Sequence, residues 1–131
     1  MSTKIFINLP VADVKAAVGF FSGLGFTFEA EFGADHSACM VIGENIFAML
    51  VSEPFFKDIT SRDVADTKAV QEVALAISID SREQVDALIE GAVSGGGQEA
   101  GEPQDEEYMY SRGFRDLDGH LWNVLYLPPA N

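Results

Sequence analysis

The stretch DLDGHLWNVLYL, residues 116–127, decides how the second half of the chain folds. Its Asp-Gly pair at 118–119 is typical of a tight turn, and the apolar run that follows predicts a strand. Because side chains of a strand alternate between its two faces, Leu121, Asn123 and Leu125 are predicted to share one face. An amide between two leucines is costly to bury without a partner, so this face is a candidate for ligand binding.

The order of predicted elements in this half repeats that of the first half. Apolar periodicity predicts strand, helix and three strands in residues 1–52, and the same order in residues 71–128. Neither half could cover its own sheet face alone, which indicates an internal duplication. We therefore expect an α+β fold in which residues 1–131 form a single domain of two βαβββ modules.

Both predicted helices carry terminal signals. Asp13 is a typical cap for the first helix, and Gly25 is a typical left-handed stop. Ser81 and Gln84 have the spacing of a capping box at the start of the second helix.

Residues 53–70 connect the two modules, and a connection of this length is uncommon within a compact domain. The run at 60–63 is expected to cap a short helix through residues 64–65, and Phe55 and Phe56 are expected to be buried. The segment is either a lid over a cavity or a linker whose aromatic rings pack at a sheet edge. The sequence leaves both alternatives open.

The charge and cysteine content limit the kinds of partner that the protein is expected to bind. The chain has 21 acidic and 8 basic residues among 131, a formal charge of −13, which repels phosphate backbones and anionic lipid surfaces. Neither nucleic acid nor a membrane is therefore expected as a partner. The single cysteine, Cys39, allows no internal disulfide, and no segment has the apolar length of a membrane span, so a cytoplasmic protein is expected.

Three stretches in this order carry a family resemblance: NLPVADVKAAVGFFSGLGF at 8–26, EVALAISIDSREQVDALIEGAVSGGG at 72–97 and FRDLDGHLWNVLYL at 114–127. Together with the duplication they resemble the vicinal oxygen chelate superfamily, which includes glyoxalase I, bleomycin-resistance proteins and extradiol dioxygenases. Small bacterial proteins called predicted lactoylglutathione lyases are the most similar group. The resemblance covers nearly the whole chain and implies modules whose strands curl around a cavity, with helices outside. It also implies self-association, so a homodimer is expected.

In metal-dependent members of that superfamily, the end strands of the modules hold a divalent ion, typically on two histidines and two glutamates. The resemblance maps these positions to Phe6 or Asn8, Ala48, Glu72 and Asn123. One carboxylate with amides and apolar residues is a poor donor set for a transition metal. No cofactor is therefore expected, and a bound divalent metal is the alternative.

The residues predicted to line the cavity for ligand binding are Phe6, Asn8, Ala48, Leu50, Leu121, Asn123 and Leu125. A mostly apolar lining with a few polar groups is typical of a small-molecule site, and a plain core is the other reading. Tyr110 and Arg112 could add to the site from a neighbouring strand. Either Arg112 or Arg115 could hold a carboxylate, although pairing with the many acidic side chains is the alternative.

Two functions follow from different readings of the same residues. As a binding protein, the chain would hold a small organic molecule without turnover, as the bleomycin-resistance branch does. As an enzyme, the resemblance implies a lyase or isomerase in which a metal polarises a carbonyl and Glu72 is the catalytic residue that moves a proton. His36 and His120 are both expected to be surface or turn residues.

Overall fold

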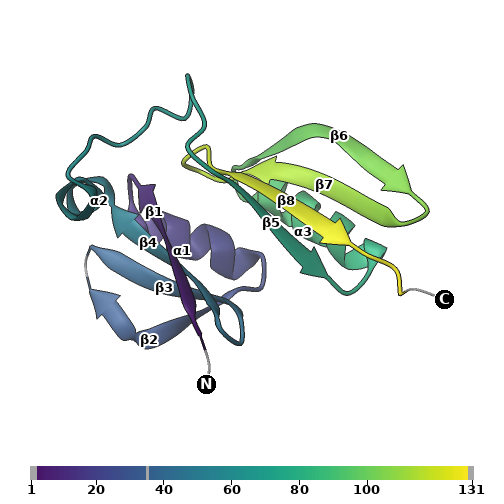
Figure 1. The fold of residues 1–131 in the computed structure, drawn as a ribbon, viewed down its shortest axis with the longest axis horizontal. Coiled ribbons are helices and arrows are strands. Elements are labelled where there is room, and N and C mark those ends of the chain that lie inside the picture. The colour runs from purple at the N-terminus through teal and green to yellow at the C-terminus, as the bar shows by residue number, and fades with distance from the viewer. Residues whose placement is uncertain (1–2, 35, 130–131) are drawn as a thin grey trace. The chain divides into compact units, whose positions relative to one another are not determined.

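A computed structural model describes residues 3–34 and 36–129, with the side chains of residues 30–34 excepted. The chain forms two compact units, Met1–Val64 and Ala65–Asn131, which we call the first and second units. Each contains the order strand, helix, strand, strand, strand (Figure 1). The predicted α+β fold with duplicated βαβββ modules is confirmed, and the prediction that both modules form a single domain stays a prediction.

The elements of the first unit are β1 (Ile5–Val11), α1 (Val14–Gly23), β2 (Thr27–Ala34), β3 (Ser37–Gly43), β4 (Ile46–Ser52) and α2 (Glu53–Thr60). Those of the second unit are β5 (Ala74–Ile79), α3 (Arg82–Ser94), β6 (Gln98–Glu106), β7 (Met109–Arg115) and β8 (Leu121–Tyr126). The strand orders are β1-β4-β3-β2 and β5-β8-β7-β6. In both sheets the first strand of the module pairs parallel with its last strand, and the other pairs are antiparallel.

Local capping explains where the main helices begin. The Asp13 side chain accepts a hydrogen bond from the backbone N–H three residues later at 3.1 Å, and Gly25 has a φ of 102° after the helix ends. Ser81 Oγ accepts from the N–H of Gln84 at 3.1 Å. The Gln84 Oε1 atom accepts a hydrogen bond from the N–H of Asp80, one position before the cap, at 3.1 Å. These caps were all predicted from the sequence.

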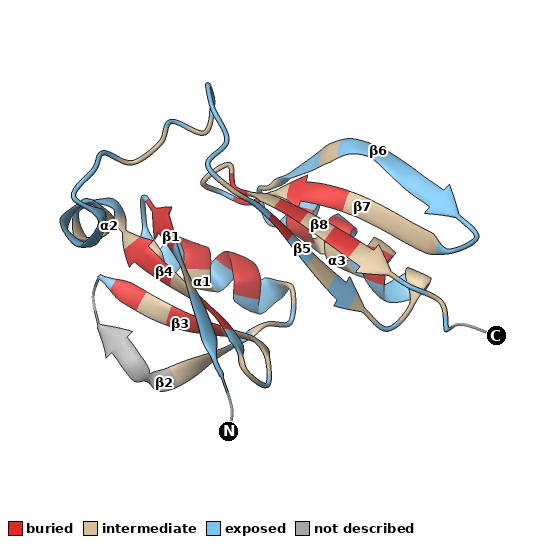
Figure 2. Cartoon of the chain, in the orientation of Figure 1, coloured by how far each residue is buried: buried red, intermediate tan, exposed pale blue. Residues whose placement is uncertain are grey.

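The core of the second unit lies between its sheet and α3, which is drawn behind the sheet in Figure 1. Phe114, Trp122 and Val124 are fully buried, and Figure 2 shows buried segments on β7, β8 and α3. Alternation places these three side chains on one face, because Phe114 is in register with Trp122. From α3 the buried side chains are Val85, Ile89 and Ala92.

The outer strand β6 contrasts with this core. Its sequence, QEAGEPQDE, is exposed along its length except at Ala100, and it contains Pro103. A register shift interrupts its pairing with β7 between Ala100 and Gln104. β6 is therefore a polar strand at the edge of its sheet.

The connection between the modules differs from its prediction. The short helix expected after the run at 60–63 is wrong, because α2 lies before that run. Ser52 caps α2 by accepting from the N–H of Phe55 at 3.4 Å, and Ser61 ends it with a φ of 61°. Phe55 is half-buried and its ring centroid lies 4.3 Å from that of His36. Among the described residues, no helix is long and apolar enough to span a bilayer.

Candidate ligand-binding site

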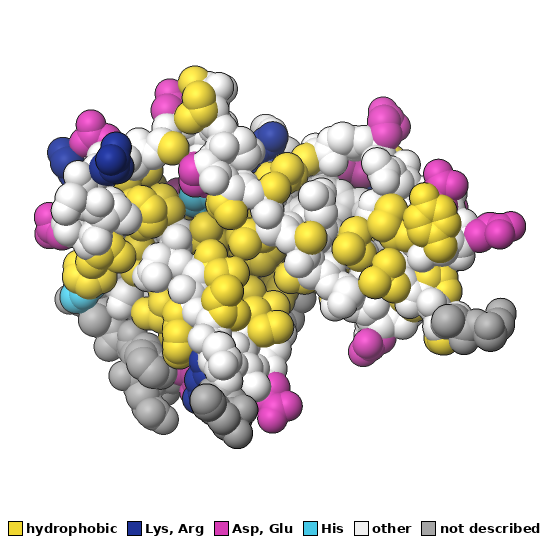
Figure 3. All heavy atoms as spheres, in the orientation of Figure 1, with side chains coloured by type: hydrophobic (Ala, Val, Ile, Leu, Met, Phe, Trp, Pro, Cys, Tyr) yellow, Lys and Arg dark blue, Asp and Glu magenta, His cyan; other side chains and the backbone are white. Residues whose placement is uncertain are grey.

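One face of the second unit's sheet lies away from α3, and we call it the open face. The pairings of β8 with β5 and β7 place nine residues on it. They are Ala74, Ala76 and Ser78 on β5, Ser111, Gly113 and Arg115 on β7, and Leu121, Asn123 and Leu125 on β8. Figure 3 shows hydrophobic side chains on the viewer's side of this unit, with acidic side chains at its margin.

The register arranges the open face in three rows across the strands. The middle row has Ala76, Asn123 and Gly113 side by side. A Cβ atom on Gly113 would lie 3.0 Å from Asn123 Oδ1 and 2.9 Å from the backbone oxygen of Ala100. The small neighbours therefore leave room for the Asn123 amide, and Leu121, Asn123 and Leu125 share one face of the sheet, as predicted.

The Asn123 amide is half-buried and makes no hydrogen bond to any residue that the structure describes. A polar group in a largely apolar row gains from a partner that fixes its orientation. The amide between two leucines is thus not used to hold the described part of this fold together.

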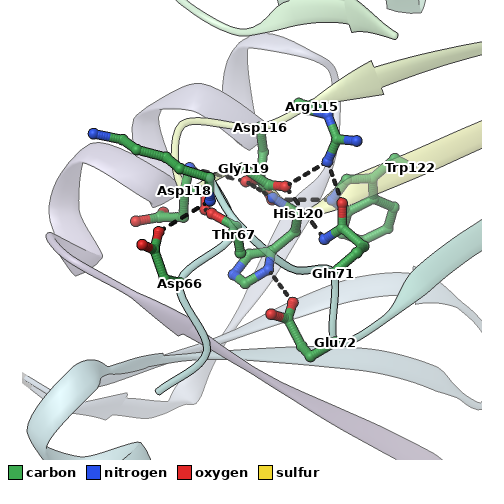
Figure 4. A network of polar contacts seen from close by, with 11 residues as sticks. Asp66, Thr67, Gln71, Glu72, Arg115, Asp116, Asp118, Gly119, His120 and Trp122 are labelled. Carbon is green, nitrogen blue, oxygen red and sulfur yellow. Dashed lines mark hydrogen bonds and ion pairs between the residues drawn. The ribbon is translucent and has the colours of Figure 1, made fainter. Parts of the chain in front are cut away.

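Arg115 lies at the end of the open face, in the row of Ala74 and Leu121. Its Nη1 donates to the backbone oxygen of Gly119 at 3.0 Å and also to Gln71 Oε1. Both acceptors are neutral, so these bonds position the guanidinium group without compensating its charge (Figure 4).

Asp116 organises the turn between β7 and β8. Its side chain is almost fully buried and accepts from the N–H groups of Asp118 at 2.9 Å and His120 at 3.0 Å. Its second oxygen accepts from Trp122 Nε1 at 3.0 Å (Figure 4). One carboxylate therefore joins the turn to the core, and the sequence analysis did not identify this role.

The segment before β5 is hydrogen-bonded to the same turn. Thr67 Oγ1 donates to the backbone oxygen of Asp118 at 2.7 Å, and Gln71 Nε2 donates to that of Gly119 at 3.4 Å. Gly119 has a φ of 82°, and a Cβ atom there would lie 2.9 Å from Thr67 Cβ. Glycine is required both by this backbone conformation and by the approach of Thr67.

Glu72 and His120 form a polar pair beside the turn. Glu72 Oε1 lies 2.8 Å from His120 Nδ1, the His120 side chain is 2% exposed, and the Glu72 side chain is 25% exposed. His120 does follow the turn, but the expectation that it lies at the surface is wrong. The signal for burial is its spacing of two residues from Trp122, which is also buried.

The other face of this sheet packs against α3, and we call it the covered face. Tyr110 and Arg112 lie on it, because they are in register with Tyr126 and Val124. Tyr110 Oη donates to Asp86 Oδ1 of α3 at 2.6 Å, and Arg112 Nη1 donates to the same atom at 2.9 Å. The structure therefore does not bring these two residues together with Leu121, Asn123 and Leu125. Which face they share could not be deduced before the register of β7 was known.

Hydrogen bonds on the covered face shift the pKa values of Asp86, Tyr110 and Arg112. The hydrogen bonds from Tyr110 and Arg112 lower the pKa of Asp86, and the bond to Asp86 raises the pKa of Tyr110. Burial lowers the pKa of Arg112, but its bonds to Asp86 and Glu99 outweigh this and leave it raised. Arg112 thus pairs with the protein's own acidic side chains, which is the alternative stated for it above.

In the first unit, Phe6 and Asn8 lie on one face of the sheet, and Phe6 stacks on Phe47 with ring centroids 4.9 Å apart. Ala48 and Leu50 lie on the opposite face, in register with Ile7 and Leu9, and both are fully buried in the core.

The prediction grouped these four residues on one face, and this grouping is wrong because it aligned the two modules one residue out of register. Ile7 and Leu75 each lie six residues before the cap of the following helix, Asp13 and Ser81 respectively. Ala48 pairs with Ile7 and Trp122 pairs with Leu75, so Ala48 corresponds to Trp122 rather than to Asn123. No ligand contact tests the predicted binding roles of these residues or of the open face, and those roles stay predictions.

The donor set implied by the resemblance does not fit a divalent transition metal. Ala48 has no donor atom and lies in the core, Asn123 offers an amide, and Glu72 is hydrogen-bonded to His120. Within residues 3–34 and 36–129, apart from the undescribed side chains, no three His, Cys, Asp or Glu side chains are grouped so that they could hold a metal ion.

The fold and its two modules match a known family. The model of the Glyoxalase/Bleomycin resistance protein/Dioxygenase superfamily matches residues 5–124. The chain therefore belongs to this superfamily, and the family resemblance seen in the sequence is confirmed. No match was found among curated proteins.

Solved structures support the same fold. A hypothetical protein, SA1046 from S. aureus, has 26% sequence identity and a TM-score of 0.82, with 96% of this chain and 95% of that chain covered. A glyoxalase/bleomycin resistance protein/dioxygenase family enzyme from Burkholderia phytofirmans PsJN has 14% identity and a TM-score of 0.81, with 97% and 100% covered. A glyoxalase-related enzyme from Fulvimarina pelagi has 19% identity and a TM-score of 0.80, with 100% and 94% covered. Because the last two proteins have low sequence identity to this chain, their structural similarity shows only that they share its fold.

Proposed function

We propose that this protein binds a small, partly apolar organic molecule on the open face, without a resident metal ion. The observation that supports it most is the half-buried Asn123 amide, which has no hydrogen-bond partner among the described residues and lies between Ala76 and Gly113. Leucines on either side of it offer apolar contact. Small-molecule sites commonly combine an apolar lining with a few polar groups that orient the ligand.

The alternative is a metal-dependent enzyme that resembles a lactoylglutathione lyase, in which Glu72 moves a proton. The observation in its favour is the carboxylate of Glu72 within hydrogen-bonding distance of the His120 imidazole. Two donors are fewer than a stable catalytic metal site needs, which makes binding without turnover our main proposal.

Binding is tested with metal-free bleomycin, a probe taken from the name of the family. We expect bleomycin to raise the melting temperature and to shift the backbone NMR signals of residues 111–115 and 121–125. The variant Ala76→Phe places a ring on the open face and should weaken this binding about tenfold or more. The matched control is Ala87→Phe, because Ala87 is also exposed but lies on α3. Equal binding by both variants would contradict the assignment to the open face.

Turnover is tested separately. The purified protein is incubated with excess Ni²⁺, Zn²⁺, Mn²⁺ or Fe²⁺, desalted and analysed for retained metal, and then assayed with methylglyoxal and glutathione for lactoylglutathione. Our proposal expects negligible retention and no product. Near-stoichiometric metal that is lost in Glu72→Ala, together with product formation, would support the enzyme instead.

We also propose that the protein acts in the cytoplasm as a homodimer. We propose that it binds the small-molecule ligand rather than nucleic acid or a membrane. The charge of −13 and the single cysteine support this setting, and self-association is implied by the family. Light scattering of the purified protein measures the oligomeric state, and a monomeric mass would overturn the dimer.

A further inference from the structure

We propose that the ligand of the open face carries a carboxylate and that Arg115 is the residue that binds it. This inference rests on the proposed function, because it names the chemistry of the molecule that binds there. It follows from how the arginines of the second unit are paired.

The other two arginines of the second unit have acidic partners. Arg82 pairs with Asp105, and Arg112 pairs with Asp86 and Glu99. Arg115 is half-buried and has no carboxylate within 4.0 Å among the described residues. Since acids outnumber basic residues by 21 to 8, a half-buried arginine that faces only neutral acceptors is unusual for this chain.

The hydrogen bonds of Arg115 leave one edge of its guanidinium group available. Both described bonds use Nη1, and they run to Gly119 and Gln71. Nε and Nη2 make no hydrogen bond to a described residue, and together they form a fork that fits the two oxygens of a carboxylate.

Arg112 shows what this fork does in the same strand. Its Nε and Nη2 both donate to Glu99 Oε2, at 3.2 and 2.9 Å. Arg115, three residues later on the opposite face, presents the same pair of donors without a protein carboxylate to receive them.

The position of Arg115 limits the kind of molecule. On the open face it is a diagonal neighbour of Asn123, and diagonal neighbours in an antiparallel pair lie roughly 7–8 Å apart. A small organic acid whose carboxylate and second polar group are a few bonds apart could therefore contact both. Leu121 lies directly beside Arg115 and offers apolar contact for the body of the molecule.

The experiment compares two probes that differ only in their terminal group: hippurate, which ends in a charged carboxylate, and N-benzoylglycinamide, which ends in a neutral carboxamide. Each is titrated into the full-length protein at neutral pH while backbone NMR signals are followed. We expect hippurate to shift the signals of residues 113–115 and 121–125 and to bind at least about tenfold more tightly than the amide, because hydrogen bonds to charged groups are the stronger ones. This comparison uses the unaltered chain and does not depend on any variant folding.

Variants then assign the preference to one side chain. Arg115→Met should remove the preference for hippurate, and Arg115→Lys should retain part of it, since lysine keeps the charge but loses the fork. The matched control Arg62→Met changes the net charge equally at an exposed arginine of the first unit and should leave the preference intact. A purely structural role of Arg115 would lower the melting temperature without changing the ratio of the two affinities.

The outcomes separate the two proposals. If both probes shift the open-face signals with equal affinity, the face binds ligands and the carboxylate assignment is overturned. The assignment also falls if Arg115→Met keeps the preference. If neither probe shifts those signals at any concentration while bleomycin does, only the carboxylate inference is overturned. If all three fail, the proposed function falls as well.

Discussion

The two units share a topology but use the same sheet positions differently. In the first unit the middle row across β1, β4 and β3 is Asn8, Met49 and Cys39. Cys39 is fully buried. Burial is the main cause that raises the pKa of its thiol, and the nearby negative charge of Glu29 raises it further. This row is filled by larger side chains and keeps its amide on the outer strand.

The corresponding row of the second unit is Ala76, Asn123 and Gly113. Here the amide lies on an inner strand, and its neighbours have almost no side chain. The comparison teaches that a duplicated backbone does not duplicate a site. What makes the open face a candidate site is the exchange of bulky for small residues around one amide.

The largest expected change in the free energy of unfolding concerns the cores of the two units, which contain different residues. Trp122→Ala should lower the free energy of unfolding by about 3–5 kcal/mol, because a fully buried indole is replaced by a cavity. Its counterpart in the first unit is already alanine, Ala48, so the two cores depend on different residues. Urea unfolding followed by circular dichroism measures the change. Phe6→Ala is the control, since that ring is 42% exposed, and an equal loss in both variants would contradict the assignment of the core.

The second prediction concerns the turn that carries Gly119. Asp116→Asn replaces one carboxylate oxygen by an amide NH₂, so either the indole N–H or the backbone N–H groups of the turn lose their acceptor. We expect a loss of about 1–3 kcal/mol in the free energy of unfolding. The indole NMR signal of Trp122 should also move. Unchanged stability with an unchanged indole signal would show that this carboxylate does not hold the turn.

A smaller change in stability is expected at Gly113, in the middle row of the second unit. Gly113→Ala should destabilise the protein by about 1 kcal/mol, because the added Cβ approaches Ala100 O and Asn123 Oδ1 and only part of that cost is offset in the unfolded chain. The control Gly19→Ala lies in α1 with nothing within 4 Å of its new Cβ. It should stabilise by about 0.5–1 kcal/mol. Thermal unfolding of both variants gives the two signs, and the same sign for both would refute the packing argument.

The smallest effect is the pH dependence of the covered face. The pKa of Asp86 lies below its ordinary value of 3.8 in the folded chain, so its contribution to stability is present above that value and is lost as the pH falls through the folded pKa. Because its side chain is 42% exposed, solvent screening should keep the contribution below about 1 kcal/mol. Asp86→Asn should therefore be slightly less stable at pH 7, and the difference from the unaltered protein should shrink as the pH falls below 3.8. A difference that does not shrink in acid would assign the effect to packing.

The features that could be predicted from the sequence are those set by neighbouring residues. Alternation placed Leu121, Asn123 and Leu125 on one face, and the caps at Asp13 and Ser81 set the helix starts. Such signals act over a few residues, so they survive without knowledge of the rest of the chain.

Features that depend on pairing between strands could not be predicted. A shift of one residue exchanges the two faces of a strand, and this is how Ala48 and Leu50 were grouped with the wrong face. The placement of Arg112 on the covered face depends in the same way on the register of β7 with β8. The role of Asp116 depends on a bond to a ring six residues later, which no local pattern indicates.

The polar outer strand β6 has a consequence for how the protein behaves at high concentration. An unpaired strand edge can recruit a strand from another molecule and start aggregation. Here a proline, a register shift and a row of acidic side chains interrupt that edge. Replacing the acids with apolar residues would therefore be expected to leave the βαβββ fold intact while making the protein prone to form fibrils.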